Sequence, residues 1–234
     1  MAVSTQARLK WVKSSPLAVI ALRRYTAFVI LEIVKCGHPI LREKGQRIDC
    51  VTPELRQLVA DMTETMHAAN GVGLAAQQIG RALMLAVVDA TASELPSELL
   101  VNGQPQDLAA WMPLALVNPV LSNAEGEQIA SEGCLSVPDM TADIRRAARI
   151  TVRAQNLDEK EITFDCMGLL ARAVQHEVDH LNGILFIDRM DAATRASFAG
   201  KIKKLQKETQ AKLGKTAKPR RKMALNLVSR LALR

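Results

Sequence analysis

Aromatic residues are scarce in this sequence, at 3% of 234 residues. The core must therefore be built from aliphatic side chains and Met, and stacking of aromatic rings on nucleic-acid bases is not expected. No stretch reaches about 18 apolar residues without charge, which argues against a membrane-spanning helix. There is no C-x-x-C pair, and the cysteines are far apart, at Cys36, Cys50, Cys134 and Cys166. This spacing excludes a dense disulfide scaffold and favours a reducing, cytoplasmic compartment.

Positive charge is concentrated at the two ends of the chain. The formal net charge is +7, yet residues 1–31 carry five basic and no acidic side chains, and residues 201–234 carry twelve basic and one acidic. The segment between them therefore has a net charge of −9. We predict a basic N-terminal extension (1–28), a folded domain (29–200) and a basic C-terminal tail (201–234). The extension has the composition of a transit peptide, so an organelle is the alternative compartment.

Hydrophobic periodicity and turn residues predict an α+β fold, with mostly antiparallel strands packed around one central helix and a basic helix near the C-terminus. Thr52 and Pro53 have the character of a helix cap and first turn. The predicted helices are 53–69, 168–182 and about 191–213, and the predicted strands are 83–89, 114–119, 127–136, 148–156 and 160–165. The polar, Pro-containing stretch from 90 to about 113 is predicted to be a loop.

The pattern HEVDH in the central helix predicts a metal site. Its spacing puts His176 and His180 on one helix face, close enough to bind one ion, with Glu177 placed to act as a general acid and base. A metal needs a third protein ligand, and Cys134, at the end of the predicted strand 127–136, is a candidate thiolate. The alternatives are a solvated helix with incidental histidines and a buried, inert cysteine.

Three motifs occur in an order that resembles the signature of the peptide deformylase family: GVGLAAQQ (71–78), EGCLS (132–136) and QHEVDHLNG (175–183). The similarity extends to EIVKCGHPILR (32–42), which looks like the family's first strand and turn, and to GILFIDRM (183–190). The resemblance covers roughly residues 29–200. It implies a deformylase-like catalytic domain that removes the N-formyl group from formyl-methionyl nascent peptides and releases formate.

The resemblance also implies roles for individual residues. It assigns Cys134, His176 and His180 as metal ligands, and Glu177 as the acid and base that serves a metal-bound hydroxide. Gln78 and the backbone N–H of Leu135 match the donors to the developing oxyanion, because the oxygen of a tetrahedral intermediate becomes negative and needs fixed donors. The alternative for Gln78 is an amide that caps a helix or a loop. Thiolate and imidazole ligands accept both Fe²⁺ and Zn²⁺, and the resemblance implies Fe²⁺ as the favoured ion, with Zn²⁺ as the alternative.

A second group of residues is expected to bind substrate. The glycines of the first motif favour close approach of a peptide, so Val72 and Gly73 are predicted to pair with its backbone like an added strand. Leu169, Arg172 and Ala173 match positions that shape the methionine pocket, with ordinary helix packing as the alternative. Glu132 matches a structural position near this pocket and should have an Arg partner, Arg145 or Arg146; the alternative is a solvated carboxylate.

The sequence departs from the family after SVP, where Asp139 and Met140 follow and Asp139 replaces the usual glycine. We expect a less permissive turn and a negative charge beside the site.

The C-terminal tail suggests binding to ribosomal RNA phosphates, with a solubilising tail as the alternative. We expect a monomer that is not associated with membranes. Two other functions remain open. One is a metallopeptidase that uses the HEVDH helix, but such enzymes usually have His or Glu as the third ligand, whereas here it is Cys134. The other is a catalytically altered, ribosome-binding relative of the family, and the presence of Glu177 argues against it.

Overall fold

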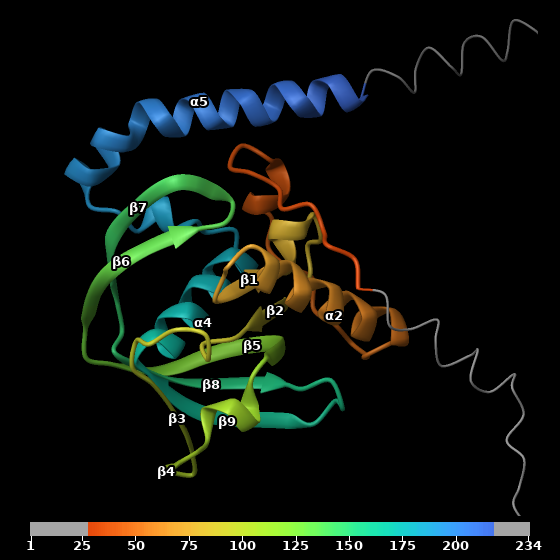
Figure 1. Ribbon diagram of the computed structural model, residues 1–234, viewed down its shortest axis with the longest axis vertical. Coiled ribbons are helices and arrows are strands. Elements are labelled where there is room, and N and C mark those ends of the chain that lie inside the picture. The colour runs from red at the N-terminus through yellow and green to blue at the C-terminus, as the bar shows by residue number, and fades with distance from the viewer. Residues whose placement is uncertain (1–27, 218–234) are drawn as a thin grey trace, which may run out of the picture.

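The computed structural model describes residues 28–217 (Figure 1). The N-terminal extension before Phe28 and the tail beyond Ala217 lie outside the described residues. The α-helices are α2 (Pro53–Ala68), α3 (Leu108–Trp111), α4 (Gly168–Leu181) and α5 (Ala192–Ala217), and short 3₁₀ helices are η2 (Pro39–Arg42), η3 (Ala76–Ile79) and η4 (Phe186–Asp188). The strands are β1 (Gly73–Ala75), β2 (Leu85–Val88), β3 (Ser97–Val101), β4 (Gln104–Pro105), β5 (Leu114–Glu125), β6 (Gln128–Cys134), β7 (Val137–Arg146), β8 (Arg149–Gln155) and β9 (Glu161–Met167).

The strands form two antiparallel sheets with helix α4 between them (Figure 1). Seven strands make one sheet in the order β1-β2-β5-β8-β9-β3-β4, and the β6–β7 hairpin is a separate sheet. Leu170 and Val174 of α4 are fully buried in the core that the larger sheet contributes. The predicted α+β fold around a central helix is therefore confirmed, and α4 presents its other side to the hairpin.

Local signals at the ends of α2 and α4 behave as predicted. The Thr52 side chain accepts a hydrogen bond from the Leu55 N–H, and Pro53 occupies the first turn. Gly168 begins α4 with φ +66°, and a Cβ there would overlap the Pro96 carbonyl oxygen, so only glycine fits. Gly183, with φ +74°, follows the end of α4. Gly168 and Gly183 thus mark where α4, the helix that carries HEVDH, begins and ends.

The predicted loop over 90–113 is wrong. It contains β3, β4 and α3, and β3 pairs with β9 so that Leu99 lies opposite Cys166 in the core. Only one side chain of β3 is buried, so the segment lacks the apolar pattern by which a strand is predicted from sequence. Strand β7 was not predicted either, because its alternating buried positions end in Ala142, Ile144 and Arg146 rather than in a run of apolar residues.

Three further boundaries differ from the predictions. Strand β5 continues to Glu125 through a register shift between Val117 and Val120, well past the predicted end at 119. Residues 32–38 contain no strand and make single backbone hydrogen bonds instead. Helix α5 runs through Gly214 to Ala217 rather than ending at 213, because an exposed glycine weakens a helix without breaking it.

Helix α5 lies across the hairpin, above its outer side in Figure 1. Its apolar residues Phe198, Ile202 and Leu205 pack against the cluster that contains Val137, Ile144 and Phe186. Its lysines are exposed: Lys201, Lys203, Lys204, Lys207, Lys212 and Lys215. Within residues 28–217, no helix has the length and apolar character that crossing a membrane requires.

Candidate active site

The three predicted ligands converge between α4 and the hairpin. Cys134 is the last residue of β6, and its Sγ lies 3.2 Å from His180 Nε2. The rings of His176 and His180 stand edge to face with centroids 5.0 Å apart. One donor atom from each of the three residues lies within 4.8 Å of the others. A sulfur and two imidazole nitrogens at this spacing form a metal-binding triad for a divalent ion.

The two histidines lie in different surroundings. His180 is 1% exposed, and burial lowers its pKa well below the ordinary value, which keeps the ring neutral. Burial opposes charge on His176 too, but the hydrogen bonds to Cys134 and Glu132 raise the pKa of His176 to about 10. His176 Nδ1 lies 3.1 Å from Glu132 Oε2, so its other ring nitrogen is left for a metal. A carboxylate on the far side of a ligating histidine fixes the ring orientation and raises its basicity. Glu132 is therefore placed to orient His176.

Glu132 is buried in a network of arginines. Arg146 donates two hydrogen bonds to it, at 2.8 and 2.9 Å, and Arg172 Nη1 lies 2.5 Å from Oε1. Burial alone would raise the pKa of Glu132, but the hydrogen bonds from Arg146 and His176 lower it to about 2. The predicted Arg partner is thus Arg146, whereas Arg145 pairs with exposed Glu127. A solvated carboxylate, the alternative for Glu132, is excluded.

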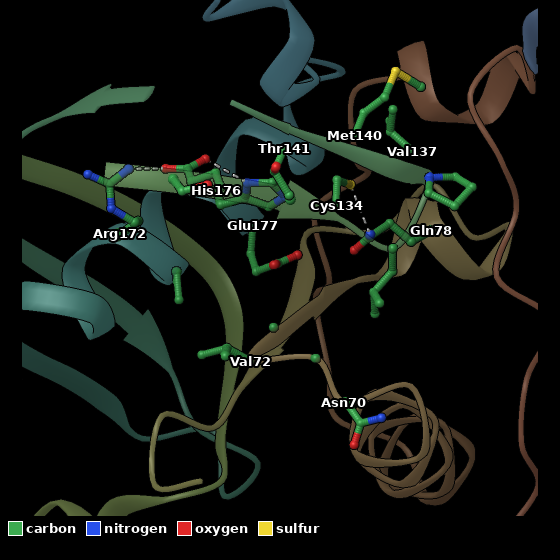
Figure 2. A pocket seen from close by; sticks show the side chains of 18 of the residues that line it. Asn70, Val72, Gln78, Cys134, Val137, Met140, Thr141, Arg172, His176 and Glu177 are labelled. Atoms are coloured by element: carbon green, nitrogen blue, oxygen red, sulfur yellow. Dashed lines mark hydrogen bonds and ion pairs between the residues drawn. The ribbon is translucent and has the colours of Figure 1, made fainter. Parts of the chain in front are cut away.

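The Glu177 carboxylate points into the space beside Cys134 and His176 (Figure 2). It is 3% exposed, and burial raises its pKa to about 7. Its Oε2 is buried without a hydrogen-bond partner among the described residues. A Cβ on Gly73 would overlap Oε1 of this carboxylate, so glycine at position 73 lets Glu177 lie where it does. A side chain of this kind is available for proton transfer.

The Gln78 amide approaches the same space from η3 (Figure 2). Its Oε1 accepts a hydrogen bond of 2.8 Å from the Ala75 N–H, and this fixes the amide so that Nε2 points toward Cys134 Sγ, 3.7 Å away. Leu135 follows Cys134 in the turn between β6 and β7. An N–H donor held rigidly beside a metal site can stabilise a negative oxygen.

These groups open into a cleft of about 640 Å³. All but one of the predicted site residues line it: Val72, Gly73, Gln78, Glu132, Cys134, Leu135, Leu169, Arg172, Ala173, His176 and Glu177. The exception is His180, which is buried. The Arg172 guanidinium turns away to Glu132 and to backbone carbonyls, among them Ile144 O at 3.0 Å. Asp139 lines the rim with φ +59°, the left-handed conformation that favours the glycine it replaces.

Sequence reasoning missed several residues around the site. Asp179, inside HEVDH, accepts hydrogen bonds from Arg146 and Arg189 on the side of α4 away from the cleft. Lys35 donates to the Leu135 carbonyl across 100 residues of sequence. The alternation of β7 could have selected Arg146 over Arg145 had that strand been predicted, whereas no sequence signal marks Lys35.

Comparisons with known proteins agree with this geometry. The sequence model of the polypeptide deformylase family matches residues 30–196. The peptide deformylase of Methylacidiphilum infernorum is 43% identical over 179 residues, 76% of this chain and 94% of that protein. The one from Opitutus terrae is 44% identical over 183 residues, 77% and 95% of the two chains. The crystal structure of Arabidopsis thaliana peptide deformylase 1B has a TM-score of 0.68 at 31% identity, with 79% and 94% covered.

Proposed function

Because this chain belongs to the peptide deformylase family and removes the N-formyl group from nascent peptides, we propose that Glu177, Gln78 and the Leu135 N–H carry out that reaction. The observation that supports this most directly is the convergence of the Glu177 carboxylate and the Gln78 amide beside the Cys134, His176 and His180 triad. The family assignment decides against the metallopeptidase alternative.

The metal would be held by Cys134, His176 and His180, with Fe²⁺ the favoured ion and Zn²⁺ the alternative. When bound, a divalent ion supplies Lewis-acid activation of the attacking water. Removing the ion should uncover one further thiol. Cys50 is exposed and should react with a thiol reagent at once, whereas Cys36 and Cys166 are buried. Chelation should therefore raise the count of reactive thiols from one to two, and Cys134→Ser should abolish the increase.

Glu177 would move the proton. Its unpartnered Oε2 is free to accept the proton of the attacking water and then to deliver it to the leaving amine. The burial of this carboxylate excludes bulk water from the transfer. Gly73 supports the same step, because its lack of a side chain leaves Oε1 in place.

The formyl oxygen would be met by two fixed donors. Gln78 Nε2 is aimed at the site because Ala75 holds the other end of the amide, and the Leu135 N–H would donate from the turn after Cys134. These donors act mainly in the transition state, where the oxygen carries negative charge. One such donor is worth about 3–4 kcal/mol in other enzymes.

The peptide would bind along β1, the edge strand of the larger sheet. The Val72 carbonyl accepts from the Asp89 N–H on the β2 side, so it is not available to a peptide, in contrast to the prediction for Val72. The alternation of antiparallel pairing turns the Gly73 N–H and C=O to the open edge. An extended peptide can pair there. The methionine side chain would lie against Val72, Leu169 and Ala173, with the aliphatic part of Arg172 behind them.

The decisive assay is anaerobic formate release from formyl-Met peptides by Fe²⁺-loaded and Zn²⁺-loaded protein. Glu177→Ala should lose at least about 10²-fold in kcat, the usual contribution of a general acid and base. Glu127→Ala, at an exposed carboxylate on the hairpin, should behave as wild type. A kcat of the Glu177→Ala protein equal to that of wild type would overturn the mechanism. Cleavage of unformylated peptides would support the metallopeptidase alternative.

The basic end of the chain would bind ribosomal RNA phosphates. The lysines of α5 are exposed while Phe198, Ile202 and Leu205 hold the helix on the domain. Replacing Lys203, Lys204 and Lys207 by Gln removes charge and keeps this packing. Co-sedimentation with ribosomes should then weaken and become less dependent on salt. An unchanged profile at low salt would leave the helix as a solubilising element.

We also propose a cytoplasmic compartment, a monomeric state and domain boundaries at 28 and 200. None of the four cysteines is paired, which supports a reducing, cytoplasmic location. We propose a monomer, which sedimentation equilibrium tests. The boundaries at 28 and 200 would be tested by limited proteolysis. A resistant fragment close to 29–200 would support them, whereas one that extends to about 217 would place helix α5 within the domain, as the packing of Ile202 and Leu205 favours. Organelle import of residues 1–28 would support the transit alternative.

A further inference from the structure

We propose that Lys35 is a positioning residue for the oxyanion donors, acting through a strap formed by residues 34–36. The strap joins the two segments that carry Gln78 and Leu135. The inference rests on the proposed function, because it concerns the geometry of the donors assigned there.

Three consecutive residues of the strap make three hydrogen bonds to these two segments. The Val34 N–H donates to the Gln78 carbonyl at 2.8 Å, and the Cys36 N–H donates to the Ser136 carbonyl at 2.8 Å. Between them, Lys35 Nζ donates to the Leu135 carbonyl at 2.7 Å. None of these bonds belongs to a strand ladder. The backbone N–H groups of Val34 and Cys36 and the side chain of Lys35 are thus all bonded to the two donor segments.

The bond from Lys35 restrains the peptide plane that follows Leu135, and the bond from Cys36 restrains the next one. On the other side of the turn, Cys134 is paired with Val137. The Leu135 side chain packs in the core beside α2. The two peptide planes after Leu135, the residue before it and its side chain are therefore all restrained, and this limits how far the Leu135 N–H can move.

Lysine is suited to this place. An ammonium bonded to a carbonyl is a charge-assisted hydrogen bond, shorter and stronger than a neutral one. Lys35 is half-buried, and burial lowers its pKa while the nearby Cys134 opposes that shift. Catalysis depends on donors that are already in place when the charge develops, and a displacement of about 1 Å can cost on the order of 10²-fold in rate.

The test compares Lys35→Met with Lys35→Arg and with Lys44→Met, a change at an exposed lysine nearby in sequence. We expect Lys35→Met to lower kcat about tenfold while KM stays within twofold, since the lost interaction acts in the transition state. Lys35→Arg keeps a charged donor and should recover most of kcat, and Lys44→Met should match wild type. Metal content and Tm are measured for each protein.

Gln78→Ala is the reference variant that distinguishes failure of the proposed oxyanion donors from failure of the positioning role of Lys35. If Gln78→Ala leaves kcat unchanged, the proposed oxyanion role fails. If Gln78→Ala lowers kcat and folded, metal-loaded Lys35→Met does not, the inference about Lys35 alone is overturned. A loss of kcat that follows metal content or Tm, without recovery in Lys35→Arg, also overturns it. Should Lys35→Met not fold, Lys35→Gln keeps an uncharged donor, and its kcat should lie between those of wild type and Gln78→Ala; an unchanged kcat would count against the strap.

Discussion

Arg145 and Arg146 are neighbours at the end of β7, yet they belong to different environments. The Arg145 side chain is 68% exposed and pairs with Glu127 on the outside of the hairpin. The Arg146 side chain is 3% exposed and bonds to Glu132 and Asp179 on the inside. The alternation of a strand gives identical side chains opposite faces. Only the inner arginine is connected, through Glu132, to a metal ligand.

The two faces differ energetically as well as geometrically. An exposed ion pair gains little, because water screens both charges and two long side chains lose freedom. A buried pair is costly to break, since removing one member leaves an uncompensated charge inside the protein. The inner network should therefore contribute most to stability and metal binding, and loss of an outer pair should change the free energy of unfolding very little.

Arg146→Met should have the largest effect on folding. It removes the shared partner of Glu132 and Asp179, which keep Arg172 and Arg189 respectively. We therefore expect a loss of about 3 kcal/mol in the free energy of unfolding, the lower end for a broken buried pair. Urea unfolding of the metal-loaded protein measures this value. A loss of less than about 1 kcal/mol, the level of a surface pair, would remove the distinction between the two faces.

Glu132→Gln should weaken metal binding as well as the fold, because Glu132 bonds both to His176 and to the buried Arg146 and Arg172. The substitution keeps the size of the side chain but weakens the acceptor that faces His176 Nδ1. We expect metal affinity to fall by about 10- to 100-fold, the usual effect of losing such a partner. Competition with a chelator gives the affinity. Glu127→Gln on the outer face is the matched control and should leave the affinity as it is.

Asp139→Gly should stabilise the protein. Asp139 is exposed and held at φ +59° beside the cleft, where glycine has no steric penalty. A gain of about 1 kcal/mol is expected, the lower end of the cost of a non-glycine residue in this region. Thermal unfolding measures the gain. A destabilised variant would show that the carboxylate makes a favourable contact that offsets the strain.

Arg145→Met should change stability least. Its only partner among the described residues, Glu127, is exposed as well, so we expect a change within about 0.5 kcal/mol. The same urea titration used for Arg146→Met gives the number. If the two variants lost equal stability, burial would not be what separates these arginines.

The sequence was sufficient wherever the signal was local. The four-residue spacing of His176 and His180 and the cap at Thr52 lie within a few residues, so the metal-binding helix and α2 were predicted closely. The choice between Arg145 and Arg146 needed the register of β7, a strand whose apolar pattern is weak. Lys35 and Leu135 are separated by 100 residues, and no spacing rule relates them. Tertiary packing alone brings them together.

The close approach of Gly73 to Glu177 affects how saturation mutagenesis of this protein is interpreted. Because a Cβ at this position overlaps the Glu177 carboxylate and must displace it, a mutational scan should score replacements at 73, alanine included, as impaired although no reacting group was removed. The first and third sequence motifs are thus sterically dependent on one another. A library that varies one while holding the other fixed will underestimate how much change the pair tolerates together.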